Sequence, residues 1–187
     1  MQSLQEAAQE EYVLIKMKRG LVYLWTGIGG GKTTSALGVA LRQAGHKQKA
    51  IIIQFMKSRK DIGEYKIRNK LKPYYEIHQF GKKGWVNLKK PTKKDKQEAK
   101  KGLIFAYKCL KKKPHLLILD EINLAVAVGL LTAKEVIEFL NKVPAKTSVY
   151  MTGRYAPKAL IDRADFATEF VTIKQPKKMI SRKGIEY

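Results

Sequence analysis

A glycine-rich run between an apolar segment and a helical pattern constrains this chain more than any other feature of its sequence. Residues 26–34 read TGIGGGKTT and directly follow the apolar run LVYLWT at 21–26. Glycines lack the side chains that block close approach, so successive backbone N–H groups can cradle phosphate oxygens. A lysine and a threonine after such a loop reach the outer phosphates and Mg²⁺. The run predicts a phosphate-binding loop at a strand–helix junction.

Lys32 and Thr33 are the expected chemical groups of this loop. The usual loop has a glycine six residues before the lysine, and this chain has Thr26 there. We expect Lys32 to lie outside the core, with its ammonium on the phosphates. The residues expected to line the nucleotide are Thr26, Gly27, Ile28, Gly29, Gly30, Gly31, Lys32, Thr33 and Thr34.

A second apolar run ends in two acidic residues. Residues 116–121 read LLILDE, a pattern typical of the Walker B strand, which places a carboxylate beside Mg²⁺. We therefore expect Thr33 and at least one of the two carboxylates to hold Mg²⁺ or Mn²⁺, with Glu121 as the ligand and Asp120 as a further ligand or its neighbour. Lys32, Thr33 and Glu121 are the expected catalytic residues. His46, His78 and His115 have no metal-ligand spacing.

Two arginines are weaker candidates for nucleotide contacts. Arg42 follows Lys32 by ten residues near the end of the predicted helix, where a solvated cation is the alternative. Arg154 follows the strand candidate SVYMT, at the sheet edge where ligands bind, and a surface ion pair is equally compatible with it.

Apolar runs and helical patterns alternate along the chain. The strand candidates show little apolar/polar alternation, as in a parallel sheet covered on both faces. They lie at residues 21–26, 50–55, 116–119 and 148–152, with weaker candidates at 75–80 and 166–173. Helices are expected at 33–44, 92–113 and 132–141, the last two with capping pairs Thr92/Asp95 and Thr132/Glu135. The order predicts an α/β fold, a P-loop NTPase-like parallel sheet sandwiched between helices.

The first 18 residues form a separate predicted element. Ser3 and Glu6 fit a capping box, and one face carries Leu4, Ala7, Ala8 and Tyr12. A frayed terminal helix and a lid are both compatible with this thin stripe. We expect an N-terminal helix or lid over residues 1–18 and one P-loop α/β domain over residues 19–187.

Charge and cysteine content limit the possible partners. The 187 residues carry a net charge of +22, and residues 57–113 hold 20 basic and five acidic residues, a net charge of +15. Such a surface attracts anionic partners, although a lysine-rich solvated surface is the plain alternative. With a single cysteine, no apolar run of spanning length and no signal-like N-terminus, we expect a cytoplasmic protein without a membrane partner.

Taken in order, the motifs resemble those of the ATP:corrinoid adenosyltransferases of cobalamin biosynthesis and salvage. That family shows TGNGKGKTT, Arg-Ala-x-Gly-His, QFIK with a following Gly-Glu, VVLDE, ITGR, Leu-x-x-x-Ala-Asp and a final GIDY. The matching segments here are residues 26–34, 42–46, 54–57, 63–64, 117–121, 151–154, 160–165 and 184–187. Ile28 and Gly30 replace the family's Asn and Lys, so one loop cation is lost.

The resemblance implies a function and a set of partners. The family transfers the 5′-deoxyadenosyl group of ATP to the cobalt of a reduced cob(I)alamin or related corrinoid and releases tripolyphosphate. Its Gly-Phe-x-Trp segment faces the corrin; here Trp85 matches the tryptophan, and the phenylalanine is missing or displaced to Phe80. The resemblance further implies a homodimer, a lid role for the N-terminal helix and a reduced flavoprotein, generally acidic, as electron donor.

Two other classes remain open on the residues alone. A P-loop ATPase that binds nucleic acid would use the basic segment, but no aromatic stacking motif is interleaved with those lysines, so we do not expect nucleic acid. A non-enzymatic nucleotide-binding module would bind ATP without turnover.

Overall fold

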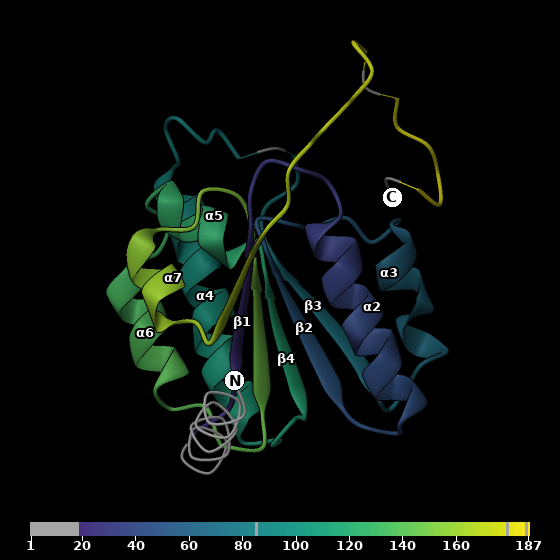
Figure 1. The fold of residues 1–187 in the computed structure, drawn as a ribbon, viewed down its shortest axis with the longest axis vertical. Helices are drawn as coiled ribbons and strands as arrows, with labels where there is room; N and C mark the ends of the chain where they lie inside the picture. The colour runs from purple at the N-terminus through teal and green to yellow at the C-terminus, as the bar shows by residue number, and fades with distance from the viewer. Residues whose placement is uncertain (1–18, 85, 179, 186) are drawn as a thin grey trace, which may run out of the picture.

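The computed structural model describes residues 19–84, 86–178, 180–185 and 187. Six strands and the helices between them alternate along the chain (Figure 1). The strands are β1 (Val22–Thr26), β2 (Ala50–Phe55), β3 (Tyr75–Phe80), β4 (Leu116–Asp120), β5 (Ser148–Thr152) and β6 (Phe166–Glu169). The helices are α2 (Lys32–Gly45), α3 (Gly63–Lys66), the 3₁₀ turn η1 (Ile67–Asn69), α4 (Lys93–Leu110), α5 (Ile122–Ala127), α6 (Ala133–Leu140) and α7 (Lys158–Arg163).

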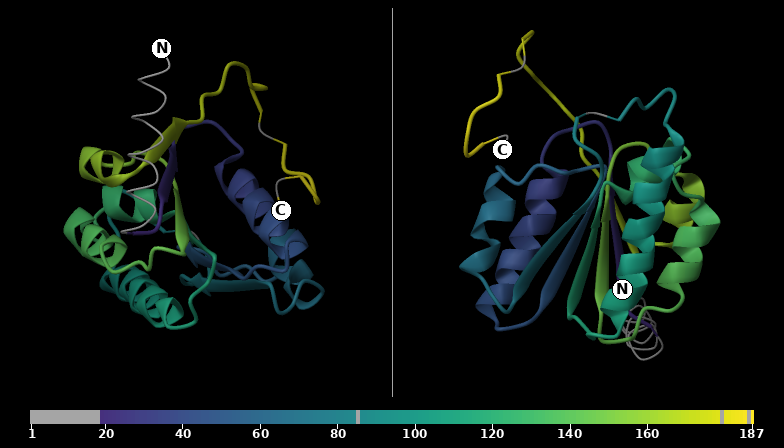
Figure 2. Two further views of the ribbon diagram at one scale, coloured as in Figure 1. Left: turned by 60° about the horizontal axis from the view of Figure 1, so that its bottom comes forward. Right: turned by 180° about the vertical axis from the view of Figure 1, so that it is seen from behind.

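The six strands form one sheet in the order β3-β2-β4-β5-β1-β6, and every neighbouring pair is parallel. Helices α2 and α3 cover one face, and α4, α5, α6 and α7 cover the other (Figures 1 and 2). This arrangement confirms the predicted α/β sandwich. Because all strands are parallel, their carboxyl ends meet at one edge, where ligands bind in such folds.

Side-chain alternation along β2 divides the core into two clusters. Ile51, Ile53 and Phe55 pack with the helices of the α4 face, whereas Ala50 and Ile52 pack under α2. Both β2 and β4 are buried throughout, as their apolar sequences predict. Each central strand therefore supports helices on both of its faces.

The helix boundaries follow local capping. Thr92 and Asp95 form a capping box at the start of α4, and Thr132 and Glu135 form another at α6, as predicted. The short helices α3 and α5 were not predicted, because four and six residues carry too little periodicity.

The chain after β6 departs from the prediction of a strand over 166–173. Strand β6 ends at Glu169, and its four residues are exposed. Beyond it the chain runs across the carboxyl edge of the sheet, past the loop between β1 and α2 (Figure 1). The terminal segment 1–18 lies outside the described residues, so the predicted N-terminal helix and the division at residue 18 stay predictions.

No helix among the described residues is long and apolar enough to cross a membrane. The single cysteine, Cys109, is a buried free thiol on α4.

Candidate nucleotide site

The glycine-rich run forms the connection between β1 and α2 at the carboxyl edge of the sheet. Gly27 has a φ of 93° and Gly31, the N-cap of α2, a φ of 100°. Both values lie in the left-handed region that glycine adopts without steric cost. The loop thus wraps the N-terminus of α2, where unsatisfied N–H groups and the helix dipole favour anions.

Lys32 folds back into this loop. Its Nζ donates to the carbonyl oxygens of Gly27 at 2.7 Å and of Gly29 at 2.5 Å, and its side chain is buried. Burial lowers the pKa of the Lys32 ammonium. Lys32 belongs to neither hydrophobic core cluster, but its side chain is buried rather than open, because the loop's own carbonyls accept hydrogen bonds from its ammonium.

Asp120, at the end of β4, lies at the centre of a polar network. Its Oδ1 accepts from the hydroxyls of Thr33 at 2.8 Å and Thr152 at 2.7 Å. Its Oδ2 accepts from Gln54 Nε2 at 3.0 Å and Lys57 Nζ at 2.7 Å. Burial opposes ionisation of Asp120, but the Lys57 cation and these donors hold its pKa below the ordinary value. The Thr33–Asp120 contact joins two of the three predicted metal ligands.

Glu121 differs from Asp120 in having an unsatisfied oxygen. It lies between β4 and α5 with a φ of 66°, and its backbone N–H donates to Thr152 Oγ1 at 3.0 Å. Its Oε2 is buried and has no hydrogen-bond partner among the described residues. Burial first, and the Asp120 charge second, raise the pKa of Glu121. Such a buried acceptor suits a cation or a ligand proton.

The two predicted arginines lie in different places. Arg154 follows β5, is exposed, and acts electrostatically on both Lys32 and Glu121, so it belongs to the same edge. Arg42 lies in the last turn of α2, about 15 Å along the helix from Lys32 at 1.5 Å per residue. It therefore lies away from the cluster formed by Lys32, Thr33, Asp120 and Glu121. Trp85 lies outside the described residues.

The loop glycines divide by what surrounds them. A Cβ on Gly29 would lie 2.7 Å from the carbonyl oxygen of Phe170, and one on Gly27 would lie 2.3 Å from that atom. A Cβ on Gly30 would meet nothing within 4 Å. The exposed loop positions are Ile28, Gly30, Gly31 and Thr34. The chain after β6, rather than a ligand alone, thus accounts for two of the glycines.

Three members of the Asp120 network were not predicted as site residues: Gln54, Lys57 and Thr152. Gln54 and Lys57 belong to the QFMK segment that follows the family pattern, and Thr152 precedes Gly153-Arg154. The available signal was that each lies at the carboxyl end of a strand. Their convergence on one carboxylate depends on the strand order, which that signal does not give.

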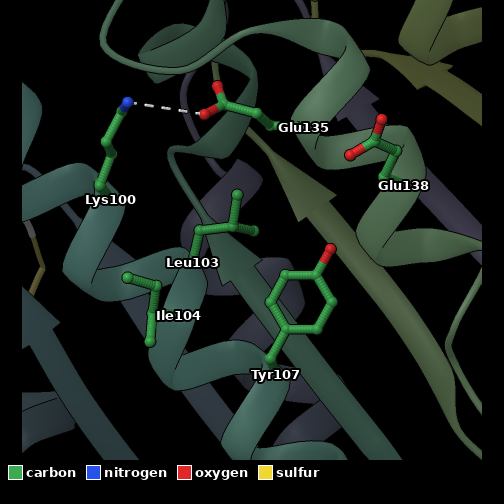
Figure 3. Close-up of a pocket in the computed structure, with 6 residues that line it drawn as sticks. All are labelled: Lys100, Leu103, Ile104, Tyr107, Glu135 and Glu138. Carbon is green, nitrogen blue, oxygen red and sulfur yellow. Dashed lines mark ion pairs between the residues drawn. The ribbon is translucent and has the colours of Figure 1, made fainter.

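A separate groove lies between α4 and α6 (Figure 3). It has a volume of about 250 Å³ and an ion pair between Lys100 and Glu135 at 3.8 Å. Its lining residues are Lys100, Leu103, Ile104, Tyr107, Glu135 and Glu138. None of them belongs to the cluster around Lys32 and Asp120.

Comparison with known proteins decides the family. The sequence model of ATP:corrinoid adenosyltransferase BtuR/CobO/CobP matches residues 18–187. The chain belongs to this adenosyltransferase family. The corrinoid adenosyltransferase of Escherichia coli (strain K12) is 29% identical over 174 residues, covering 92% of this chain and 87% of the relative. The corrinoid adenosyltransferase CobA of Salmonella typhimurium is 33% identical over 173 residues, covering 89% of this chain and 81% of the relative.

A third relative extends the match over the full chain. The corrinoid adenosyltransferase of Pseudomonas aeruginosa is 28% identical over 190 residues, covering all of this chain and 93% of the relative. The enzyme described here is accordingly an ATP:corrinoid transferase, and its glycine-rich loop and acidic strand end lie together at the carboxyl edge of the sheet.

Proposed function

We propose that this adenosyltransferase moves the 5′-deoxyadenosyl group of ATP to the reduced cobalt of a corrinoid and releases tripolyphosphate. The cobalt(I) centre attacks C5′ of the ribose, a Co–C bond forms, and the bond between C5′ and the triphosphate oxygen breaks. The observation that carries the proposal is the junction of Lys32, Thr33, Asp120 and Glu121 at the N-terminus of α2 in a member of this family.

The loop would hold the leaving group. Lys32 would exchange its two carbonyl acceptors for phosphate oxygens, and backbone N–H groups within Gly27–Gly31 would complete the cradle. Since Gly29 already donates to Phe170, the neighbouring N–H groups would carry this role. Charge builds up on the polyphosphate as the C5′–O bond breaks, and a positioned cation stabilises it.

Thr33, Asp120 and Glu121 fit a magnesium site. Among the described residues no three His, Cys, Asp or Glu side chains gather as a metal cage. Mg²⁺ commonly binds through one or two carboxylates plus substrate phosphates, so a threonine and two carboxylates beside a phosphate loop are sufficient. The buried, unpartnered Oε2 of Glu121 supports this assignment. The ion would supply charge neutralisation at the polyphosphate.

The remaining roles rest on the family. Arg154, exposed beside Lys32 and Glu121, would contact the nucleotide, whereas the position of Arg42 gives it no part in this cluster. Trp85 would shield the corrin. A homodimer would complete the site, with the N-terminal helix as its lid. An acidic reduced flavoprotein in the cytoplasm would supply the electron. The net charge of +15 over residues 57–113 supports steering of such a donor.

Product analysis tests the proposal. ATP and a chemically reduced corrinoid are mixed with the enzyme, and the phosphorus products are identified by ³¹P NMR. We expect tripolyphosphate in step with Co–C bond formation, and no consumption of ATP without corrinoid. Stoichiometric ADP and phosphate, or phosphate release stimulated by nucleic acid, would instead indicate an ATPase.

A further inference from the structure

Donors from the protein itself use the full acceptor capacity of Asp120. A carboxylate offers about four acceptor sites, and Asp120 receives two donors on each oxygen. One of these donors to Asp120 is Thr33, which is expected to bind the same metal ion as Asp120. A divalent ion that uses Asp120 must therefore displace a donor.

Lys57 is the donor best placed to leave. Gln54 and Thr152 are fully buried, and Gln54 is also held by Gln79 Nε2 at 2.9 Å. Lys57 is 28% exposed in its side chain, has a flexible stem and approaches the network from the end of β2. Its Nζ lies 2.7 Å from Asp120 Oδ2 and 3.5 Å from Thr33 Oγ1, so a positive charge stands beside both residues.

We infer that Lys57 is a tethered cation that occupies the metal-binding side of Asp120 in the nucleotide-free enzyme and makes Mg²⁺ binding depend on nucleotide. This inference rests on the proposed function, because it takes Thr33, Asp120 and Glu121 as the metal ligands. It assigns a role to a residue that neither the loop motif nor the acidic strand end contains.

The physical reason is charge balance. A free divalent ion would push the Lys57 ammonium away from its carboxylate and leave two cations close together, with Lys32 and Arg154 adding to the local positive charge. When a triphosphate is bound, the displaced ammonium gains phosphate oxygens as new acceptors. Metal and nucleotide then favour each other's binding, and linkage requires this coupling to be reciprocal.

The chain contains a matched control pair. Lys82 contacts Asp95 at 2.9 Å, with side-chain exposures of 28% and 2%. Lys57 contacts Asp120 at 2.7 Å, with exposures of 28% and 1%. The two pairs have the same chemistry and similar side-chain exposure, but Asp95 caps α4 and is bonded to Thr92, whereas Asp120 is bonded to Thr33 of the phosphate loop.

The experiment measures Mn²⁺ binding to the full-length, nucleotide-free protein by EPR of the free ion. We expect Lys57→Met and Lys57→Gln to bind Mn²⁺ about 10-fold more tightly than the wild type, because the ion no longer has to displace the Lys57 ammonium from Asp120. A tenfold change corresponds to about 1.4 kcal/mol, the size of one modest ion pair. We expect Lys57→Arg, which keeps the cation, to bind Mn²⁺ as weakly as the wild type. Lys82→Met should change the Mn²⁺ affinity by less than about 2-fold. Circular dichroism of each variant checks folding.

Two outcomes separate the inference from the proposed function. The metal site itself would be rejected if ATP does not increase the Mn²⁺ affinity of the wild type and if Glu121→Gln leaves that affinity unchanged. A normal Mn²⁺–ATP complex together with unchanged Mn²⁺ affinity in folded Lys57→Met and Lys57→Gln overturns only the role of Lys57. Tighter binding in Lys57→Arg as well would show that side-chain shape, and not charge, controls the site.

Discussion

The backbone N–H of Gly29 donates a 2.8 Å hydrogen bond to the carbonyl oxygen of Phe170, which joins the phosphate loop to the chain that leaves β6. The centroid of the Phe170 ring lies 6.0 Å from Lys32 Nζ. The loop is therefore fixed from outside as well as by its own turn, and its geometry depends on residues about 140 positions later in the sequence.

Substitution of Gly29 tests this contact. A methyl group there meets Phe170 at 2.7 Å, so we expect Gly29→Ala to shift the loop, weaken ATP binding about 10-fold and destabilise the protein by about 1–3 kcal/mol, the usual cost of overpacking. Gly30→Ala is the control, since its Cβ meets nothing within 4 Å. Calorimetric ATP titration and urea unfolding of both variants provide the check; equal behaviour of the two would contradict the structural role of Phe170.

Gly30 also allows a gain of function. Its neighbourhood is open, and the related loop sequence carries a lysine at this position. We expect Gly30→Lys to fold normally and to bind ATP several-fold more tightly, because it adds a cation beside the phosphates. The gain should shrink as salt is raised. Gly30→Gln, with a similar length and no charge, is the matched variant and should leave the ATP affinity near that of the wild type.

Lys32→Ala should reduce adenosyl transfer by roughly 10²–10³-fold, the size seen when one preorganised donor is lost. Because Lys32 is buried and bonded to two carbonyls, the free energy of unfolding should also fall by about 1–2 kcal/mol. Lys158→Ala, on the exposed surface of α7, should change neither quantity by a measurable amount. Single-turnover assays and denaturant curves separate the two effects; near wild-type transfer in Lys32→Ala would remove the loop from the mechanism.

The Glu76 carboxylate on β3 gives a pH-dependent contribution to stability. Burial alone would raise its pKa, but hydrogen bonds from Lys112 and Lys49 lower it from 4.5 to about 2. A lowered carboxyl pKa stabilises the fold at pH values above the unfolded pKa, and this stability is lost as the pH falls from 4.5 toward 2.

Since Lys112 is about half exposed, solvent screening reduces the effect, and we expect Glu76→Gln to cost about 1 kcal/mol at pH 7. The difference in free energy of unfolding between the two proteins should shrink steadily below pH 4.5. Urea titrations at pH 7, 4 and 3 measure it, and a difference that grows on acidification would reverse the sign argued here.

Cys109 should be inert in the folded enzyme. Its thiol lies on the buried face of α4, and burial raises its pKa to about 11. At pH 8 about one molecule in 10³ then carries the thiolate, the reactive form. We expect Ellman's reagent to label Cys109 orders of magnitude more slowly in the native protein than in urea, with the denatured chain as the reference.

Local features of the sequence were sufficient to predict much of the fold. The loop at 26–34, the acidic end of β4 and the caps at Thr92 and Thr132 each depend on residues a few positions apart. Their chemistry is encoded in short spacings, because a helix cap or a phosphate loop is formed by neighbours in the chain.

Tertiary structure decided how these parts meet. Strand order placed β2 next to β4, which brings Lys57 and Gln54 to Asp120, and placed β6 next to β1, which brings Phe170 to Gly29. The periodicity of a segment specifies which of its faces is buried, but it does not specify the neighbour that buries that face. For that reason the sequence was sufficient to predict the loop, the acidic strand end and the helix caps. The contact of Lys57 with Asp120, and that of Phe170 with the phosphate loop, depend on the folded chain.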